Sequence, residues 1–132
     1  MSGISYHRVR LIAMLKAAKD AVKKVKKRDG SIVPFDQAKI TNAVHKAITA
    51  ALGREDLKLA TRISDWVTRE LPKRFGGKVI PGVEDIQDIV EEALIEKDLT
   101  KVARAYILYR SERAKLREAK KLVPKDVKSL AE

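Results

Sequence analysis

Apolar residues recur every three or four positions along most of this chain, which is the period of an amphipathic α-helix. Short polar breaks containing glycine or proline separate these periodic stretches. The pattern therefore predicts helices over residues 4–25, 36–53, 56–71, 83–95 and 100–121.

Several residues mark where these helices begin and end. Asp36 is a good N-cap, and Phe35 before it is placed to pack on Ile40 as a hydrophobic staple. Gly53 is expected to close that helix. Pro72 is expected to end the next one, and Thr100 is expected to cap the last.

A change of pattern between the first two helices predicts a β-hairpin. Asp29-Gly30 lies between two short β-prone segments, and Pro34 ends the second of them. The short segment 78–80 is expected to add a third strand. The predicted fold class is α+β and mostly helical: a small three-stranded sheet caps a bundle of about four helices, with an extra basic N-terminal helix.

Length and composition exclude several classes of protein. The chain has 132 residues, which suits one domain, and it contains no cysteine, which excludes thiol catalysis and disulfides. His7 and His45 lie far apart without carboxylates at metal-ligand spacing, so no metal site is expected. We find no catalytic constellation and no membrane span or signal peptide. The expectation is a cytoplasmic protein that is not an enzyme.

The net charge of +11 suggests a polyanionic partner, with nucleic acid the first candidate. The charge is unevenly placed, however: residues 1–28 carry +8, residues 29–113 are neutral, and residues 114–132 carry +3. A basic amphipathic first helix can bind nucleic acid or a membrane surface, or can simply dock its apolar face on the domain. The sequence leaves these alternatives open.

Three cations are predicted to converge near the hairpin. Lys27 and Arg28 precede the tight turn, and Lys39 lies one turn into the next helix. Charge-assisted hydrogen bonds of about 1.5–3 kcal/mol each suit a phosphate chain. A flat apolar slot for a base could be lined by Val25, Phe35 and Ile40. Alternatively, a Lys-Arg pair beside a turn is ordinary solvated surface.

A longer pattern favours the binding site. Residues 25–40 (VKKRDGSIVPFDQAKI) resemble the opening signature of the ATP-cone domain. The resemblance continues through 83–91 (VEDIQDIVE) and 102–113 (VARAYILYRSER). It covers about residues 25 to 113, so the chain divides into a basic helical extension (1–24), an ATP-cone domain (25–113) and a helix end with a polar tail (114–132).

The resemblance implies a site for ATP or dATP beneath the hairpin, with separate residues for the phosphates, the base and the sugar. It implies phosphate contacts from Lys27, Arg28, Lys39 and a cation of the last helix. That cation is Arg110 or Arg113; the sequence does not decide between them, and Arg110 is taken as the site residue. It implies adenine packing by Val25, Phe35, Ile40 and Ile86, with Asp36 at the base edge. Val83 and Gln87 would lie near the sugar or phosphates, and Mg²⁺ would accompany the triphosphate. Some ATP-cones carry a glutamate where this chain has Val33, so any contact from a glutamate side chain to the base is absent here.

The function implied is allosteric sensing. ATP and dATP would compete for one site and control a ribonucleotide-reductase-type assembly through nucleotide-dependent oligomerisation, because such domains regulate reductases and the repressor of reductase genes. One alternative is a nucleotide-gated nucleic-acid-binding regulator that uses the basic first helix. Another is a plain interaction module. The absence of a zinc ribbon argues against the repressor.

Overall fold

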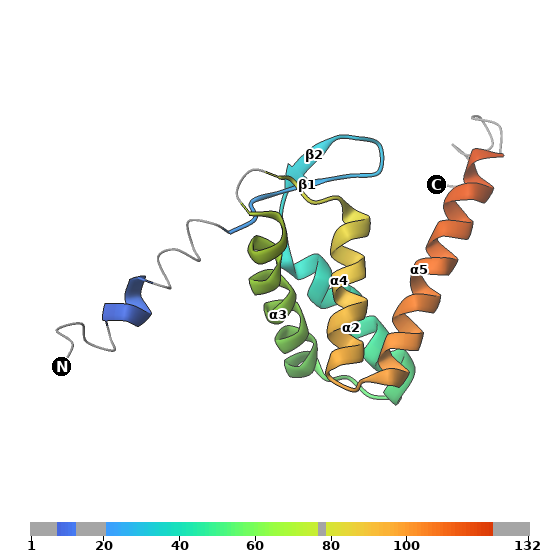
Figure 1. The fold of residues 1–132 in the computed structure, drawn as a ribbon. Coiled ribbons are helices and arrows are strands. Elements are labelled where there is room, and N and C mark those ends of the chain that lie inside the picture. Colours follow the sequence, from blue (N-terminus) through green and yellow to red (C-terminus); the bar gives the residue numbers. More distant parts are fainter. Residues whose placement is uncertain (1–7, 13–20, 77–78, 123–132) are drawn as a thin grey trace.

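The computed structural model describes residues 8–12, 21–76 and 79–122. Within them, a two-stranded hairpin lies across one end of a group of packed helices (Figure 1). The elements are, in chain order, β1 (Lys24–Lys26), β2 (Ile32–Pro34), α2 (Gln37–Leu52), α3 (Leu57–Phe75), α4 (Val83–Glu96) and α5 (Thr100–Lys121). This confirms a mostly helical fold with a small antiparallel sheet.

The hairpin forms where Asp29-Gly30 predicted it. Gly30 has a φ of 90°, a conformation that glycine adopts without steric cost. The Asp29 carboxylate accepts a hydrogen bond of 2.9 Å from the backbone N–H of Ser31, which holds the turn. The strands pair with Val25 opposite Val33. Because side chains alternate along a strand, these two valines share the face that looks toward the helices.

The predicted third strand is wrong. Val79 and Ile80 form no strand, and Lys78 lies outside the described residues. Within the described residues the sheet is extended by a single parallel bridge between Lys26 and Gly82, with the Lys26 N–H donating to the Pro81 carbonyl at 3.0 Å. Proline has no N–H to donate, so a regular ladder cannot run through this segment.

The predicted N-terminal helix is confirmed only in part. Residues 8–12 are helical, but residues 21–23 have no regular structure and the chain is already a strand from Lys24. Residues 1–7 and 13–20 lie outside the described residues. The helix prediction fails at its C-terminal end because Val25 serves the sheet: it is 8% exposed and faces the core. The Phe35 N–H also donates to the Lys23 carbonyl at 2.8 Å.

The boundaries of α2 are as predicted. The Asp36 side chain accepts a 3.0 Å hydrogen bond from the Ala38 N–H, which satisfies one of the free donors of the first turn. At the other end Gly53 has a φ of 70° and its N–H reaches the Thr49 carbonyl. The prediction that Asp36 caps this helix and Gly53 closes it is confirmed, and Gly53 does so in the left-handed conformation.

The prediction that Pro72 ends its helix is wrong, because α3 continues for another turn to Phe75. The proline removes one N–H, but the Gly76 N–H still bonds to the Pro72 carbonyl at 2.9 Å. This last turn is tied to α4 by Arg74, whose Nη2 lies 2.6 Å from an oxygen of Glu92. Phe75 in the same turn packs against the hydrophobic core, and together these tertiary contacts offset the local cost of the proline.

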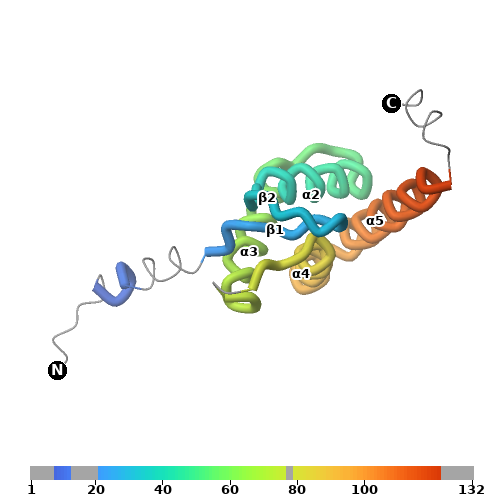
Figure 2. The backbone as a smooth tube through the Cα atoms, turned by 90° about the horizontal axis from the view of Figure 1, so that it is seen from above, coloured from blue at the N-terminus to red at the C-terminus, as the bar shows by residue number. Residues whose placement is uncertain are grey.

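Helix α5 also begins slightly differently from the prediction. Thr100 is its first helical residue, and Leu99 occupies the N-cap without a side-chain hydrogen bond. The Leu99 carbonyl accepts from the Ala103 N–H at 2.8 Å. The C-terminal half of α5 then extends away from the other helices (Figures 1 and 2).

One hydrophobic core lies between the helices. Helix α2 packs on α3 and α5, and α4 packs on the same two helices. The largest fully buried aliphatic side chains of this core recur at helical intervals along the four helices. They are Val44, Ile48, Ile63, Val67, Leu71, Ile89, Val90, Leu94 and Val102. Among the described residues no helix is long and apolar enough to span a membrane.

Candidate ligand-binding pocket

A cavity of about 190 Å³ lies beneath the hairpin. Viewed from above, β1 and β2 lie between α2 and α4 (Figure 2). The cavity walls come from both strands, the first two turns of α2, the first half of α4 and the second turn of α5. They are formed by Val25, Lys27, Val33, Pro34, Phe35, Asp36, Lys39, Ile40, Ala43, Val83, Ile86, Gln87, Val90 and Tyr106.

The periodicity of each element brings these side chains to the cavity. Strand alternation turns Val25 and Val33 toward it, while helical spacing does the same on α2, where Lys39 and Ala43 are four residues apart. Nine of the eleven predicted site residues line it. They are Val25, Lys27, Phe35, Asp36, Lys39, Ile40, Val83, Ile86 and Gln87.

Two cations lie at the edge of this apolar cavity. Lys27 comes from the end of β1 and Lys39 from the first turn of α2, and both side chains are exposed to solvent. Within the described part of the chain, neither ammonium has an ion pair. Both are therefore available to an anionic group, and the N-terminus of α2 adds favourable dipole charge nearby.

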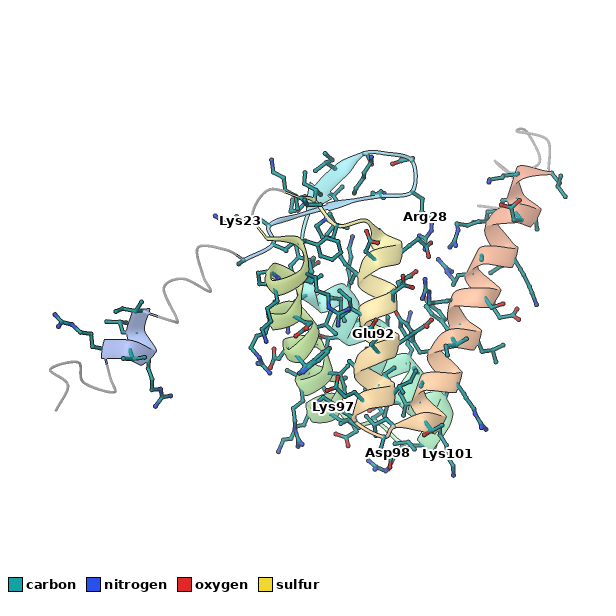
Figure 3. The ribbon with its side chains drawn as sticks, in the orientation of Figure 1. Lys23, Arg28, Glu92, Lys97, Asp98 and Lys101 are labelled. Atoms are coloured by element: carbon teal, nitrogen blue, oxygen red, sulfur yellow. The ribbon has the colours of Figure 1, made fainter. Side chains whose placement is uncertain are left out.

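Arg28 lies beside the cavity rather than in its wall. Its Nε donates to Glu84 Oε1 at 2.8 Å, and its Nη2 donates to Gln87 Oε1 at 3.3 Å. Figure 3 shows Arg28 at the end of α4 that faces the hairpin. The hairpin loop is thus attached to α4 through the residue predicted to bind phosphate.

Arg110 is bound by carboxylates of α4 and does not line the cavity. Its guanidinium donates to Glu84 at 2.8 Å, Asp88 at 3.0 Å and Glu91 at 2.7 Å. These bonds raise the pKa of Arg110 although its burial opposes the shift. Arg110, and then Arg28, hold the pKa of the Glu84 carboxyl below its usual range. Arg113, the alternative predicted cation, is exposed and also lies outside the cavity wall.

The sequence analysis did not assign five lining residues to the site: Val33, Pro34, Ala43, Val90 and Tyr106. Tyr106 is the largest of them and is only 3% exposed, so its ring closes the cavity from α5. Burial raises the pKa of its hydroxyl. Two signals in the sequence could have identified further lining residues. Tyr106 lies within the 102–113 pattern, and Val90 follows Ile86 by four residues on the same helix.

The described residues hold no group of three or more His, Cys, Asp and Glu side chains that could bind a metal ion. Fold and cavity together define a small helical binding module. Its cavity suits a ligand that combines a flat apolar part with negative charge, because apolar walls meet exposed cations at one edge.

Comparison with known proteins assigns the family. The model of the ATP cone domain matches residues 23–115, and the chain belongs to the ATP-cone domain family. The membership predicted from the resemblance of the three sequence segments is therefore confirmed. The predicted domain limits at residues 25 and 113 remain a prediction.

Relatives of the chain are reductases. It is 41% identical over 107 residues to a vitamin B12-dependent ribonucleoside-diphosphate reductase of Thermoplasma acidophilum, and 44% identical over 100 residues to one of Mycobacterium tuberculosis. An anaerobic ribonucleoside-triphosphate reductase of Haemophilus influenzae is 36% identical over 106 residues. The matches cover 77%, 76% and 80% of this chain, but only 13%, 14% and 15% of those reductases.

Proposed function

We propose that this chain binds ATP or dATP in the cavity beneath the hairpin and acts as an allosteric regulatory domain of a ribonucleotide-reductase-type assembly. ATP-cone domains bind ATP or dATP as allosteric effectors. The observation that carries the proposal is the apolar cavity with Lys27 and Lys39 at its edge. These are the two kinds of surface that a nucleotide needs.

The adenine ring would lie among the apolar side chains. Val25 comes from β1, Phe35 from the segment after β2, Ile40 from α2 and Ile86 from α4, so the base would be packed from several sides. Asp36 would meet the base edge from the start of α2. Aromatic and aliphatic packing would supply the binding energy that charge–charge contacts with exposed lysines lack.

The phosphates would extend toward Lys27, Lys39 and Arg28. Charge-assisted hydrogen bonds contribute about 1.5–3 kcal/mol each and are not additive. Micromolar affinity needs about 8 kcal/mol, so base and phosphate contacts are both required. We propose that Mg²⁺ accompanies the triphosphate and is held by phosphate oxygens. The direct phosphate contact of Arg110 remains a prediction, and its bonds to three carboxylates do not favour it.

Discrimination between ATP and dATP would depend on one hydroxyl of the sugar. Val83 and Gln87 line the cavity at the start of α4, where the sugar would lie. The Gln87 amide can both donate and accept, although its oxygen already accepts from Arg28. A polar group that needs the hydroxyl as its partner would disfavour dATP.

The proposed regulatory target is a reductase. Three reductases each contain a segment similar to most of this chain within a much longer protein. We propose that the nucleotide changes how this domain associates, so that oligomeric state carries the signal. The described residues supply no catalytic group in this proposal, and the regulated activity would belong to the assembly.

Isothermal titration calorimetry tests the nucleotide site. We expect saturable binding of ATP and dATP with Mg²⁺, and at least about tenfold weaker binding after Lys27→Ala or Lys39→Ala, which corresponds to about 1.4 kcal/mol. Lys46→Ala is the matched control, because Lys46 is an exposed lysine of α2 that does not line the cavity. Absence of binding, or equal effects of Lys39→Ala and Lys46→Ala, would refute the proposal.

Light scattering with each nucleotide tests the proposed oligomerisation. We expect the mass to differ between the ATP and dATP samples, or between either sample and the protein alone. A constant mass together with saturable binding would exclude oligomerisation as the signal and leave the nucleotide site in place. A constant oligomer without nucleotide binding would favour the plain interaction module.

A further inference from the structure

Glu84 connects two arginines that come from different parts of the fold. It lies in the first turn of α4, beside the cavity residue Val83. Its Oε1 accepts from Arg28 Nε and its Oε2 accepts from Arg110 Nη2, both at 2.8 Å. One carboxylate thus uses both oxygens to bridge the hairpin and α5.

This bridge changes the charge available at the edge of the cavity. Arg28 follows Lys27 directly in the chain, and its guanidinium is neutralised by a carboxylate at ion-pair distance. A phosphate oxygen that reaches Arg28 therefore meets the negative charge of Glu84 as well. The ligand must displace Glu84 from Arg28 or bind beside it, and both alternatives cost binding energy.

We propose that Glu84 is a specificity-determining residue that lowers the affinity of the cavity for polyphosphate by competing with the ligand for Arg28. This inference rests on the proposed nucleotide site. Glu84 itself need not contact the base or the sugar. Its effect is confined to the charged part of the ligand, so it sets how strongly the site prefers a nucleotide triphosphate to the uncharged nucleoside.

The other acidic residues of α4 are placed differently. Asp88 and Glu91 bind Arg110 at 3.0 and 2.7 Å, and in the described part of the chain neither bonds to Arg28. Arg110 would keep these two partners if Glu84 were neutralised. The structure therefore singles out Glu84 as the carboxylate whose removal releases Arg28 without leaving Arg110 unpaired.

Substitution Glu84→Gln tests the proposal, with ATP and adenosine titrated by calorimetry. The glutamine keeps the size of the side chain and removes its charge. We expect ATP to bind about threefold to tenfold more tightly, because the Arg28 charge that Glu84 now neutralises becomes available to the phosphate, and one charge near a solvent-exposed phosphate is worth roughly that factor. We expect adenosine binding to stay unchanged, and the gain for ATP to shrink as salt screens the charges.

Two further variants make the test specific to the contact with Arg28. Asp88→Asn removes one negative charge one turn along α4, from a residue that in the described part of the chain pairs with Arg110 and not with Arg28. It should change the affinity for ATP less than twofold, because the charge it removes does not neutralise Arg28. In an Arg28→Ala background, Glu84→Gln should also lose most of its effect on ATP affinity, because the arginine for which Glu84 and the phosphate compete is no longer present.

Each outcome decides the proposal. Unchanged or weaker ATP binding by Glu84→Gln would overturn it, as would an equal gain from Asp88→Asn or an equal change in adenosine binding. Circular dichroism checks that the variants fold, and since the Glu84 side chain is 56% exposed we expect them to do so. If the wild-type chain itself fails to bind ATP, the proposed nucleotide site has failed. If it binds ATP and Glu84→Gln does not bind ATP more tightly, only the role of Glu84 has failed.

Discussion

Substitution of Arg110 by methionine should destabilise the domain more than the substitution of an exposed arginine of α5. The Arg110 side chain is 18% exposed and bonded to Glu84, Asp88 and Glu91. Methionine preserves much of the apolar stem but removes the guanidinium. The three carboxylates would then lie along one face of α4 without the cation that now joins them to α5.

The magnitude lies between two limits. Exposed ion pairs contribute up to about 1 kcal/mol, whereas breaking a buried pair costs about 3–5 kcal/mol. Arg110 is largely buried, but Glu84 and Asp88 are 56% and 64% exposed, so water screens them when the cation is removed. We therefore expect a loss of about 2 kcal/mol, which lowers Tm by about 10 °C for a domain of this size.

The loss should depend on pH. Because Arg110 lowers the folded-state pKa of Glu84, the pair stabilises the fold above the usual carboxyl range and loses this contribution as pH falls through the lowered pKa. The difference in Tm between the two proteins should be greatest at neutral pH and should decrease toward about pH 3.

Thermal unfolding followed by circular dichroism at several pH values measures both effects. Arg113→Met is the control, because Arg113 is an exposed arginine of α5 that makes no ion pair within the described part of the chain. It should change stability by less than about 0.5 kcal/mol. A Tm for Arg110→Met within about 2 °C of wild type, or a deficit that is the same in acid, would refute this reasoning.

Three further predictions concern the ends of α2 and the wall of the cavity. Asp36→Ala should cost about 1 kcal/mol in denaturant unfolding because it removes the N-cap, whereas Asp36→Asn should preserve most of that stability; equal losses would contradict the capping role. Gly53→Ala should also cost about 1 kcal/mol in the same assay, because alanine is strained at a φ of 70°, and an unchanged midpoint would contradict this. Burial raises the folded-state pKa of Tyr106, so wild-type stability should fall as pH rises above about 10, where the unfolded tyrosine ionises. Tyr106→Phe should fall less steeply in alkaline thermal unfolding, and identical profiles for the two proteins would exclude this contribution.

Local signals predicted much of the secondary structure. Asp29-Gly30 specified the hairpin turn, and Asp36 and Gly53 specified the ends of α2, because each effect arises within a few residues. The boundaries that failed depend on distant contacts. Helix α3 continues past Pro72, where Arg74 bonds to Glu92 of α4, and a pattern within one helix does not reveal that partner.

The cavity could be predicted to a similar extent. Local sequence patterns and the family resemblance named nine residues that the structure brings to one cavity. Tyr106 was missed because it lies within one of the matched segments without any signal that sets it apart from its neighbours. The sequence named Lys27 and Lys39, which line the cavity, but it did not show that another predicted cation, Arg110, is bound elsewhere. Arg110 is bonded to three carboxylates of another helix.

The sequence by itself determined the family, the helical periodicity, the hairpin turn and most of the apolar cavity wall, because these depend on residue type and short spacing. Only the tertiary structure decided that the third strand is reduced to one bridge at Gly82 and that Glu84 joins Arg28 to Arg110. The physical reason is the range of the interactions. A cap or a turn is formed by neighbours in the chain, whereas an ion pair depends on which helices pack together and on the direction each side chain takes.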